Sequence, residues 1–520
     1  MSELTPKNNK VKWIITITVI VASLMELIDI SIVNVALRTI GGNLGATIEE
    51  VAWVVTAYAI ANIIIIPLTG FLSARFGRKN YFVTSIVIFT IASFFCGNAT
   101  NIWELVAFRF LQGLGGGALL STSQTFLVDT FSKDELGKAN GLFGLGIVMG
   151  PTLGPTIGGY ITDTFSWQWI FYVNIPIGII ASLLSWKYIK EASYKQEIRK
   201  VDWAGIILLI ASIGSIQYVL EDGASKDWFE SKLIVGFATL GITSLLLFIW
   251  WELRTPFPAV NLRLFKRRTV ALGSLLTLVQ GIGIFVPVFL FPLFTQNLLG
   301  WTAQQTGLMM LPGAFCGGAL IGMSGKMLSK GVSPKLLLTL GFIASFTFCY
   351  LVSQSNLETN YNHFHIILLI RGMGIGLMFI PIVTMALSGL EPKDVPQAAG
   401  LTNMMRQLGG TIGIALMTVF ITNRSAEHRI DLVSHITMYD DATKERVAAI
   451  SNGLVAQGKN PNDVTAMAYG SLNGTIIKQT TMLSYMEGFF VMGLFFLAGI
   501  GIVFLVKSSK GAKVDASAAH

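Results

Sequence analysis

Long apolar runs separated by short polar stretches extend over almost the whole chain. A helix needs about 20 mainly apolar residues to cross the hydrocarbon core of a bilayer, and many of these runs reach that length. The pattern therefore predicts an all-α membrane protein with fourteen transmembrane helices. The helices are expected at residues 13–37, 51–71, 81–99, 103–127, 137–162, 169–189, 203–221, 232–252, 270–296, 306–325, 334–353, 364–390, 397–422 and 483–506.

The predicted helices form two sets of six with two helices inserted between them. Residues of the fourth helix that recur in the twelfth are Arg109, Gly113, Gly115 and Gly117, repeated as Arg371, Gly372, Gly374 and Gly376. The turn at 70–77 likewise has a degraded copy at 325–331. Internal repeats around a central site are typical of secondary transporters.

This repeat divides the chain into seven segments. We expect an N-terminal tail (1–12), a six-helix bundle (13–189), the inserted helices with their flanking loops (190–269), helices 9 to 13 of a second bundle (270–422), a long loop (423–482), helix 14 (483–506) and a C-terminal tail (507–520).

Lys and Arg collect in alternate loops, and the positive-inside rule therefore places both termini in the cytoplasm. The long loop 423–482 then lies on the outer side, with a helix predicted at 443–457. Loops of this length are uncommon, and a role in docking a partner and a tolerated surface insertion are both open.

Composition supports a membrane protein and excludes several other classes. The chain is 52% hydrophobic and 13% charged, with a mean hydropathy of +0.64, whereas soluble domains are about a quarter charged. A net charge of +8 could suggest nucleic acid, but no basic soluble segment exists. We expect no enzyme, cofactor or metal, because nucleotide-binding and metal-ligand spacings are missing. Cys96, Cys316 and Cys349 lie in apolar runs and are predicted to be packing residues.

Two acids interrupt the first helix. Glu26 and Asp29 are three residues apart, so a helix presents them on one face. A charged side chain at the bilayer centre costs roughly 2.5–3.5 kcal/mol on insertion scales, and such acids usually mark a proton or ion path. Arg109 in helix 4 needs a partner for the same reason. We therefore predict a pair between Arg109 and Asp29, as part of proton coupling or as a purely structural salt bridge.

Three motifs resemble those of the major facilitator superfamily. Residues 70–79 read G-F-L-S-A-R-F-G-R-K and are similar to its G-x-L-x-D-R-x-G-R-K signature, with Ala74 in place of the usual acid. Residues 109–113 resemble its R-x-x-Q-G motif, and the glycines of 141–159 match the motif of its antiporters. The residues expected to serve conformational change are Gly70, Arg75, Gly77, Arg78, Gln112, Gly113, Gly150, Gly154, Pro155, Gly158 and Gly159.

Further stretches at 29–37, 167–178 and 400–407 are similar to the fourteen-helix drug:proton antiporters of the EmrB/QacA type, in particular EmrB-type export permeases. The resemblance implies a proton-coupled multidrug efflux antiporter of the bacterial inner membrane, with Asp29 as proton carrier and Arg109 as its partner. It also implies a periplasmic adaptor of the EmrA type and an outer-membrane channel. Proton-coupled uptake of a small solute, or a non-transporting sensor on this fold, are the alternatives.

A substrate cavity is expected between the two bundles near the middle of the membrane, where apolar and aromatic surfaces with few polar groups accept varied ligands. Packing against lipid or other helices is the ordinary alternative for each candidate. The candidate substrate-binding residues are Glu26, Tyr58, Gln124, Gln280, Phe285, Phe289, Phe379, Asn403, Met404 and Arg406.

Overall fold

The computed structural model describes residues 9–131, 133–191, 202–223, 226, 228–390, 394–437 and 439–505. The predicted tails 1–12 and 507–520 lie mostly or wholly outside these residues. The first bundle consists of α1 (Asn9–Leu44), α2 (Ile48–Phe76), α3 (Arg78–Gly97), α4 (Ile102–Gly116), α5 (Leu119–Thr130), α6 (Lys133–Thr164), α7 (Trp169–Tyr172) and α8 (Asn174–Tyr188). The inserted pair is α9 (Trp203–Asp222) and α10 (Lys232–Arg254), flanked by the short η2 (Trp228–Glu230) and η3 (Leu262–Lys266). The second bundle consists of α11 (Arg268–Asn297), α12 (Ala303–Ser329), α13 (Pro334–Ser353), α14 (His363–Leu387), α15 (Val395–Ser434) and α17 (Pro461–Leu505), with α16 (Asp441–Ala456) between the last two.

The predicted all-α architecture is confirmed, with two of the predicted helices divided. Twelve segments of the described chain are long and apolar enough to cross a membrane. The other two predicted crossings are α6, which Gly, Pro and Thr make less apolar, and the 103–127 helix. The latter breaks after a glycine-rich stretch at Gly117, so α4 and α5 are separate helices. The 169–189 helix likewise divides at Val173 into α7 and α8.

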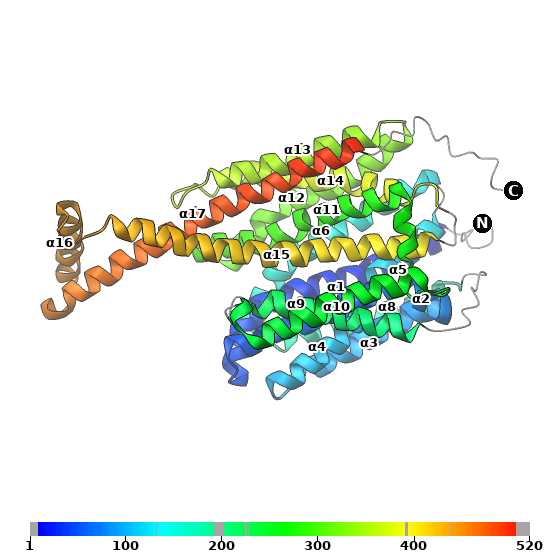
Figure 1. Cartoon of the computed structure of the whole chain (residues 1–520), viewed down its shortest axis with the longest axis horizontal. Helices are drawn as coiled ribbons and strands as arrows, with labels where there is room; N and C mark the ends of the chain where they lie inside the picture. Colours follow the sequence, from blue (N-terminus) through cyan, green and yellow to red (C-terminus); the bar gives the residue numbers. More distant parts are fainter. Residues whose placement is uncertain are drawn as a thin grey trace.

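The two bundles meet along two helix pairs, α6 with α12 and α2 with α15. Small residues allow the close approach: a Cβ atom on Gly144 would lie against Ile321, and one on Gly307 against Thr156. These two contacts are more than two helical turns apart, so the two helices stay together over a long stretch. Figure 1 shows the two bundles side by side, with α11 to α14 above, α1, α3 and α4 below, and α6 between them beside α12.

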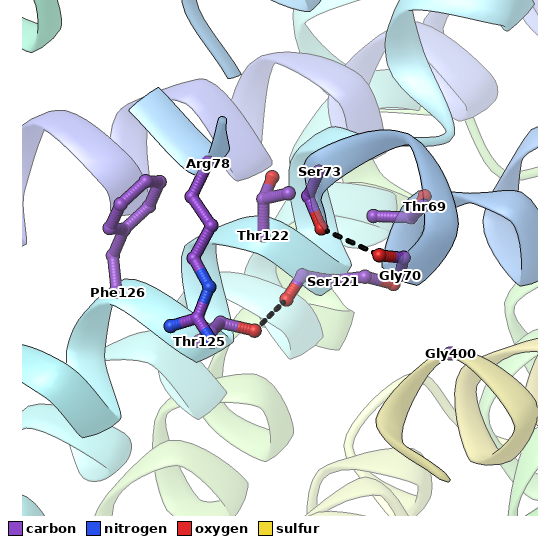
Figure 2. Close-up of a pocket in the computed structure, with 9 residues that line it drawn as sticks. All are labelled: Thr69, Gly70, Ser73, Arg78, Ser121, Thr122, Thr125, Phe126 and Gly400. Atoms are coloured by element: carbon purple, nitrogen blue, oxygen red, sulfur yellow. Dashed lines mark hydrogen bonds between the residues drawn. The ribbon is translucent and has the colours of Figure 1, made fainter. Parts of the chain in front are cut away.

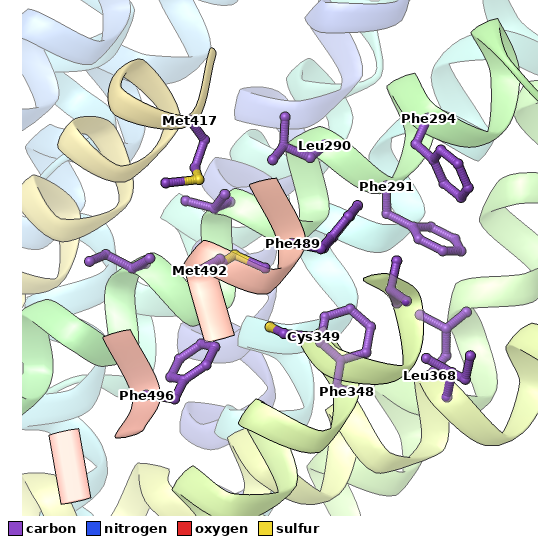
Figure 3. Packing of buried hydrophobic residues seen from close by; sticks show 14 of the residues in the cluster. Leu290, Phe291, Phe294, Phe348, Cys349, Leu368, Met417, Phe489, Met492 and Phe496 are labelled. Carbon is purple, nitrogen blue, oxygen red and sulfur yellow. The ribbon is translucent and has the colours of Figure 1, made fainter. Parts of the chain in front are cut away.

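The second bundle has the larger continuous apolar core. Side chains from α11, α13, α14, α15 and α17 interlock there, as Figure 3 shows for Phe291, Phe294, Phe348, Phe489 and Phe496. A second cluster crosses the interface between the bundles, since it joins Met25 and Phe143 of the first bundle to Ile284 and Phe379 of the second. Apolar packing therefore connects the bundles at the level where a substrate site is expected.

The inserted helices α9 and α10 pack on each other, and α9 also lies against α2 and α15. An apolar cavity of about 650 Å³ separates the pair from α15. Phe248 and Met404 line it, and Lys266 contributes the charged side chain. The sequence pattern did not predict this cavity, because nothing in it fixes where the inserted pair docks.

The segment 423–482, expected to be a loop, is largely helical. α15 continues twelve residues past its predicted end at 422, and α17 begins 22 residues before its predicted start at 483. The predicted helix at 443–457 corresponds to α16, whose first turn is capped by the Asp440 side chain. Figure 1 shows α16 and the adjoining ends of α15 and α17 projecting from the bundle at the end opposite to the start of α1. We call this region, residues 423–482, the protrusion.

Candidate functional site

Asp29 lies on α1 at the centre of a buried polar network in the first bundle. Its side chain is completely buried, and its Oδ2 accepts a hydrogen bond from Arg109 Nη1 at 2.5 Å. Its Oδ1 accepts from Gln112 Nε2 at 2.9 Å and from Asn174 Nδ2 at 2.8 Å. Gln112 also donates to Ser93 Oγ at 2.7 Å. The charge of Asp29 therefore has one cation and two amides around it, and the predicted pair with Arg109 is present.

Arg109 is held by more than its carboxylate. Its Nε donates to the carbonyl of Val54 at 3.2 Å, and Nη1 also donates to Gln112 Oε1 at 2.7 Å. The Tyr58 ring lies beneath the guanidinium at 4.2 Å from its centroid, and the Phe171 ring lies at 5.7 Å. A buried guanidinium needs such a full set of partners to offset the loss of water. The position of Arg109 is thus fixed by four helices of one bundle.

Glu26 has a separate environment one helical turn away on α1. It is 3% exposed, and its Oε1 accepts a hydrogen bond from Asn62 Nδ2 at 3.1 Å. Its Oε2 accepts from the backbone N–H of Leu120 at 3.2 Å, in the first turn of α5. Free N–H groups and the helix dipole make a helix N-terminus favourable for an anion. The helix break after Gly117 therefore leaves the Leu120 N–H free to donate a hydrogen bond to Glu26.

The glycines of α6 bring that helix directly against α1. A Cβ on Gly150 would lie 2.6 Å from Leu27 Cβ, and a Cβ on Gly158 would lie 2.7 Å from Ile32 Cγ1. At Gly154 the added atom would overlap Ser31 Oγ. Substitution at these positions would displace the segment of α1 that bears Asp29. Pro155 and Gly159 of the same motif are half-buried.

The motif at 70–79 covers the end of α2, the turn at Gly77 and the start of α3. Gly77 has φ +88°, a conformation that favours glycine, and a Cβ there would also meet the Glu191 carboxylate. Arg78 pairs with Asp129 at the end of α5 at 2.6 Å. An acid thus faces Arg78 from a different helix, although Ala74 occupies the usual acidic position. Arg75 is exposed.

The same turn region contacts the second bundle through Gly70. A Cβ on Gly70 would lie 3.4 Å from Gln397 on α15, and one on Gly400 would lie 3.5 Å from the carbonyl of Ile66. Figure 2 shows a small cavity between α2, α5 and α15, with Ser121 and Gly400 at its edge. The predicted motifs at 70–79 and 400–407 therefore lie close to each other at the bundle interface, on the two sides of this cavity.

The second bundle presents a different polar cluster, around Arg406 of α15. Arg406 Nη1 donates to Asn403 Oδ1 at 2.6 Å, and Arg406 Nε donates to Gln280 Oε1 at 3.4 Å. The guanidinium lies over the Phe379 ring at 4.9 Å. Asn403 Nδ2 in turn donates to Ser121 Oγ of the first bundle at 3.0 Å. Four predicted substrate residues are therefore adjacent at the bundle interface.

The remaining predicted substrate residues are more scattered. Phe285 packs against the cluster that crosses the interface, whereas Phe289 packs against the core of the second bundle. Met404 lines the cavity beside the inserted helices, on another face of α15. Gln124 is half-buried on α5. The structure thus does not bring Phe289 and Met404 together with Arg406, and their contact with substrate stays a prediction.

Several polar partners in the first bundle were not selected from the sequence. Asn174 lies within the 167–178 motif, which would have been the signal for it. Asn62 and Ser93 had no signal beyond being polar residues in apolar runs. Cys96 is buried as predicted and lies 3.6 Å from Gln112 Oε1, so it borders the network. Cys349 is buried as well, but Cys316 is only half-buried.

Comparisons with known proteins agree with this architecture. Residues 19–414 match the Major Facilitator Superfamily. The chain is 33% identical over 507 residues to the fatty acid resistance protein FarB of Neisseria gonorrhoeae, covering 96% of this chain and 97% of that one. It is 31% identical over 523 residues to the multidrug export protein EmrB of Escherichia coli K12, covering both chains fully.

Solved structures show the same fold at low sequence identity. A bacterial homologue of the lysosomal transporter Spinster, in an inward-facing conformation, superposes with a TM-score of 0.58 at 12% identity, covering 96% of this chain and 97% of that one. The human transporter MFSD10 gives 0.55 at 11% identity, covering 95% and 99%. The protein therefore belongs to the Major Facilitator Superfamily of membrane transporters, in the family that includes the EmrB export proteins.

Proposed function

We propose that the protein is a proton-coupled antiporter that exports amphipathic toxic compounds across the bacterial inner membrane, with both termini in the cytoplasm. The observation that carries the proposal is the buried pair of Asp29 and Arg109, with no exposed side-chain area on Asp29. A carboxylate at this depth that can gain or lose a proton changes the charge of the bundle interior. That is the change a proton-driven transporter requires.

Protonation of Asp29 would remove the charge that opposes Arg109. The guanidinium would keep its contacts to Gln112 and to the Val54 carbonyl but would lose its anionic partner. Proton binding thereby favours the conformation in which Arg109 has other partners, and proton release favours the one seen here. Each proton that moves inward supplies about 2.3 kcal/mol per 100 mV of membrane potential. Glu26 is a second titratable group on the same helix.

The direction of transport rests on two further points. The glycine face of α6 matches the antiporter motif and packs on the segment of α1 that contains Asp29. Relatives that align with nearly the whole chain are named for multidrug export and for fatty acid resistance. Both favour export in exchange for protons over uptake.

Everted membrane vesicles test this proposal directly. Vesicles are energised so that protons accumulate inside, and a panel of cationic and anionic amphiphiles is then added while proton release is recorded. We expect release with the wild-type protein and none with Asp29→Asn. Asp441→Asn is the matched control, because it makes the same substitution at a side chain that is 90% exposed on α16. Normal release by Asp29→Asn would exclude Asp29 as the proton carrier.

We also propose that the protrusion docks a periplasmic adaptor of an export complex that continues to an outer-membrane channel. Large apolar side chains are exposed on it, including Ile430 at 70%, Tyr439 at 82% and Val455 at 47%. Meanwhile Val447, Val464 and Ala468 are buried and hold α16 against α17. Substituting the three exposed residues with Ser should abolish drug resistance of cells but leave proton release in vesicles intact. Unchanged resistance would favour a tolerated insertion.

A further inference from the structure

Arg406 is a buried cation whose hydrogen-bonding capacity is only partly used. It is 3% exposed and lies where α11, α14 and α15 meet. Nη1 and Nε donate to Asn403 and Gln280, but Nη2 has no hydrogen-bond partner among the described residues. Gln280 is completely buried, and its Nε2 is also without a partner there. Two unused N–H donor groups thus belong to side chains that contact each other.

No carboxylate in the part of the chain that the structure describes balances this charge. The only acid between residues 268 and 390 is Glu358, which lies in the loop between α13 and α14, and none occurs from 395 to 426. Among the described residues, no Asp or Glu forms an ion pair with Arg406. Leaving a guanidinium uncompensated at membrane depth is costly, so such residues normally pair with an anion. Glu487 of α17 is held by Arg424 and His428. An anion for Arg406 is therefore expected from outside the second bundle.

The surroundings of Arg406 suit the remainder of an amphipathic molecule. The Phe379 ring, over which the guanidinium lies, belongs to the apolar cluster that crosses the bundle interface. Asn403 connects Arg406 to Ser121 of the first bundle, so the cluster spans both halves. A ligand bound here would therefore contact the two halves that move relative to one another in transport.

We propose that Arg406 and Gln280 bind the anionic head group of a transported amphiphile, such as a carboxylate, whose apolar part packs along the interface cluster that includes Phe379. This assignment rests on the proposed export function and defines its substrate class. A carboxylate has two acceptor oxygens, and Arg406 Nη2 and Gln280 Nε2 can each donate to one of them. A cationic amphiphile would instead be repelled by Arg406.

Binding of a matched pair of probes tests the proposal. The full-length protein is reconstituted in nanodiscs of phosphatidylcholine and titrated with dansylaminoundecanoic acid or with dansylaminoundecylamine, which share a fluorophore and chain but differ in head-group charge. We expect the wild-type protein to bind the acid at least about tenfold more tightly than the amine. Arg406→Gln should weaken binding of the acid by roughly tenfold to a hundredfold, the range for a hydrogen bond to a charged group.

Three further variants separate a binding site from a structural role. Arg406→Lys keeps the charge and should retain part of the affinity for the acid. Gln280→Glu supplies a carboxylate beside Arg406 and should prevent binding of the acid probe, although the arginine itself is unchanged. Arg371→Gln is the control, because it removes another buried arginine of the same bundle, which donates to the Ile284 carbonyl. It should leave the preference for the acid intact.

Several outcomes would overturn the assignment. Equal binding of the acid by wild type and Arg406→Gln would do so, as would a preference for the amine. The nanodiscs can also be made with phosphatidylglycerol, an anionic lipid, in place of part of the phosphatidylcholine. If the acid probe then no longer binds, Arg406 would be assigned to a phospholipid head group instead. Proton release in vesicles with cationic compounds alone would also refute anion binding, yet it would leave the proposed antiport standing. Failure of antiport itself would appear as no proton release with any compound.

Discussion

The two bundles share a packing scheme but differ in how they treat their buried charges. In the first bundle, Gly150 and Gly154 of α6 pack against α1; in the second, Gly409 and Gly413 of α15 pack against α11. α1 has Glu26 and Asp29 near its middle, whereas α11 contains neither Asp nor Glu. The repeat has therefore preserved the close helix contacts and not the acids.

The buried arginines show the consequence. Arg109 has a carboxylate, an amide, a carbonyl and two aromatic rings around it. Its repeat counterpart Arg371 has one hydrogen bond, to the Ile284 carbonyl at 3.3 Å, and an Nε without a partner among the described residues. In the first bundle the charge of Arg109 is balanced by Asp29, a carboxylate that can exchange a proton. In the second bundle neither Arg371 nor Arg406 has a carboxylate partner among the described residues, and Arg406 is the one assigned above to an external anion.

Removing Arg109, the arginine that is paired with a carboxylate, should have the largest effect on stability and transport. Arg109→Gln leaves Asp29 buried without its cation, and breaking a buried pair in this way costs about 3–5 kcal/mol. We expect a lower unfolding midpoint in detergent, followed by intrinsic fluorescence, and no proton release in vesicles.

The double variant Asp29→Asn with Arg109→Gln separates the two effects. It removes both charges, so stability should return toward that of the wild type while transport remains absent. If Arg109→Gln alone is as stable as the wild type, the interpretation of Asp29 and Arg109 as a neutralising pair is wrong.

The packing glycines provide the next comparison. A Cβ on Gly154 would overlap Ser31 Oγ and lie 2.9 Å from the Ile32 backbone nitrogen, whereas one on Gly413 would meet the side-chain ends of Val286 and Ile282. Side-chain ends can shift more readily than backbone. Gly154→Ala should therefore cost about 1–3 kcal/mol, the usual range for overpacking, and Gly413→Ala less.

Gly474→Ala in α17 is the matched control for both glycine variants. A Cβ there would meet nothing within 4 Å, so the helix should be unaffected or slightly stabilised. The measurement is again the unfolding midpoint, together with proton release. Equal losses at positions 154 and 413 would show that the α1–α6 contact has no special role.

These contrasts indicate which parts of the site a sequence can predict. Asp29 and Arg109 could be paired because charges inside a membrane need partners, and few candidates exist. The partners of Glu26 could not be predicted. One is Asn62, a polar residue in an apolar run, and the other is the Leu120 backbone N–H, which is free because the helix breaks at Gly117. The lengths of the apolar runs likewise predicted the transmembrane helices. They did not predict that α15 continues to Ser434, because the residues after 422 are largely polar and a polar helix outside the membrane has no apolar run to mark it.

The smallest expected effect concerns Arg371, the counterpart of Arg109 in the second bundle. Arg371→Met removes a buried charge that no described carboxylate balances and loses one long hydrogen bond to Ile284. Replacing a buried ionic group by an apolar side chain of similar size is often neutral or stabilising. We therefore expect no loss of stability and a gain of about 1 kcal/mol, measured as the unfolding midpoint beside Arg109→Met, which should lose several times that amount. If Arg371→Met raises stability and Arg109→Met lowers it, the two equivalent arginines lie in unequal electrostatic environments. A comparable loss at both positions would mean that Arg371 has an anionic partner in the membrane, and the difference between the bundles would then lie in where that anion comes from.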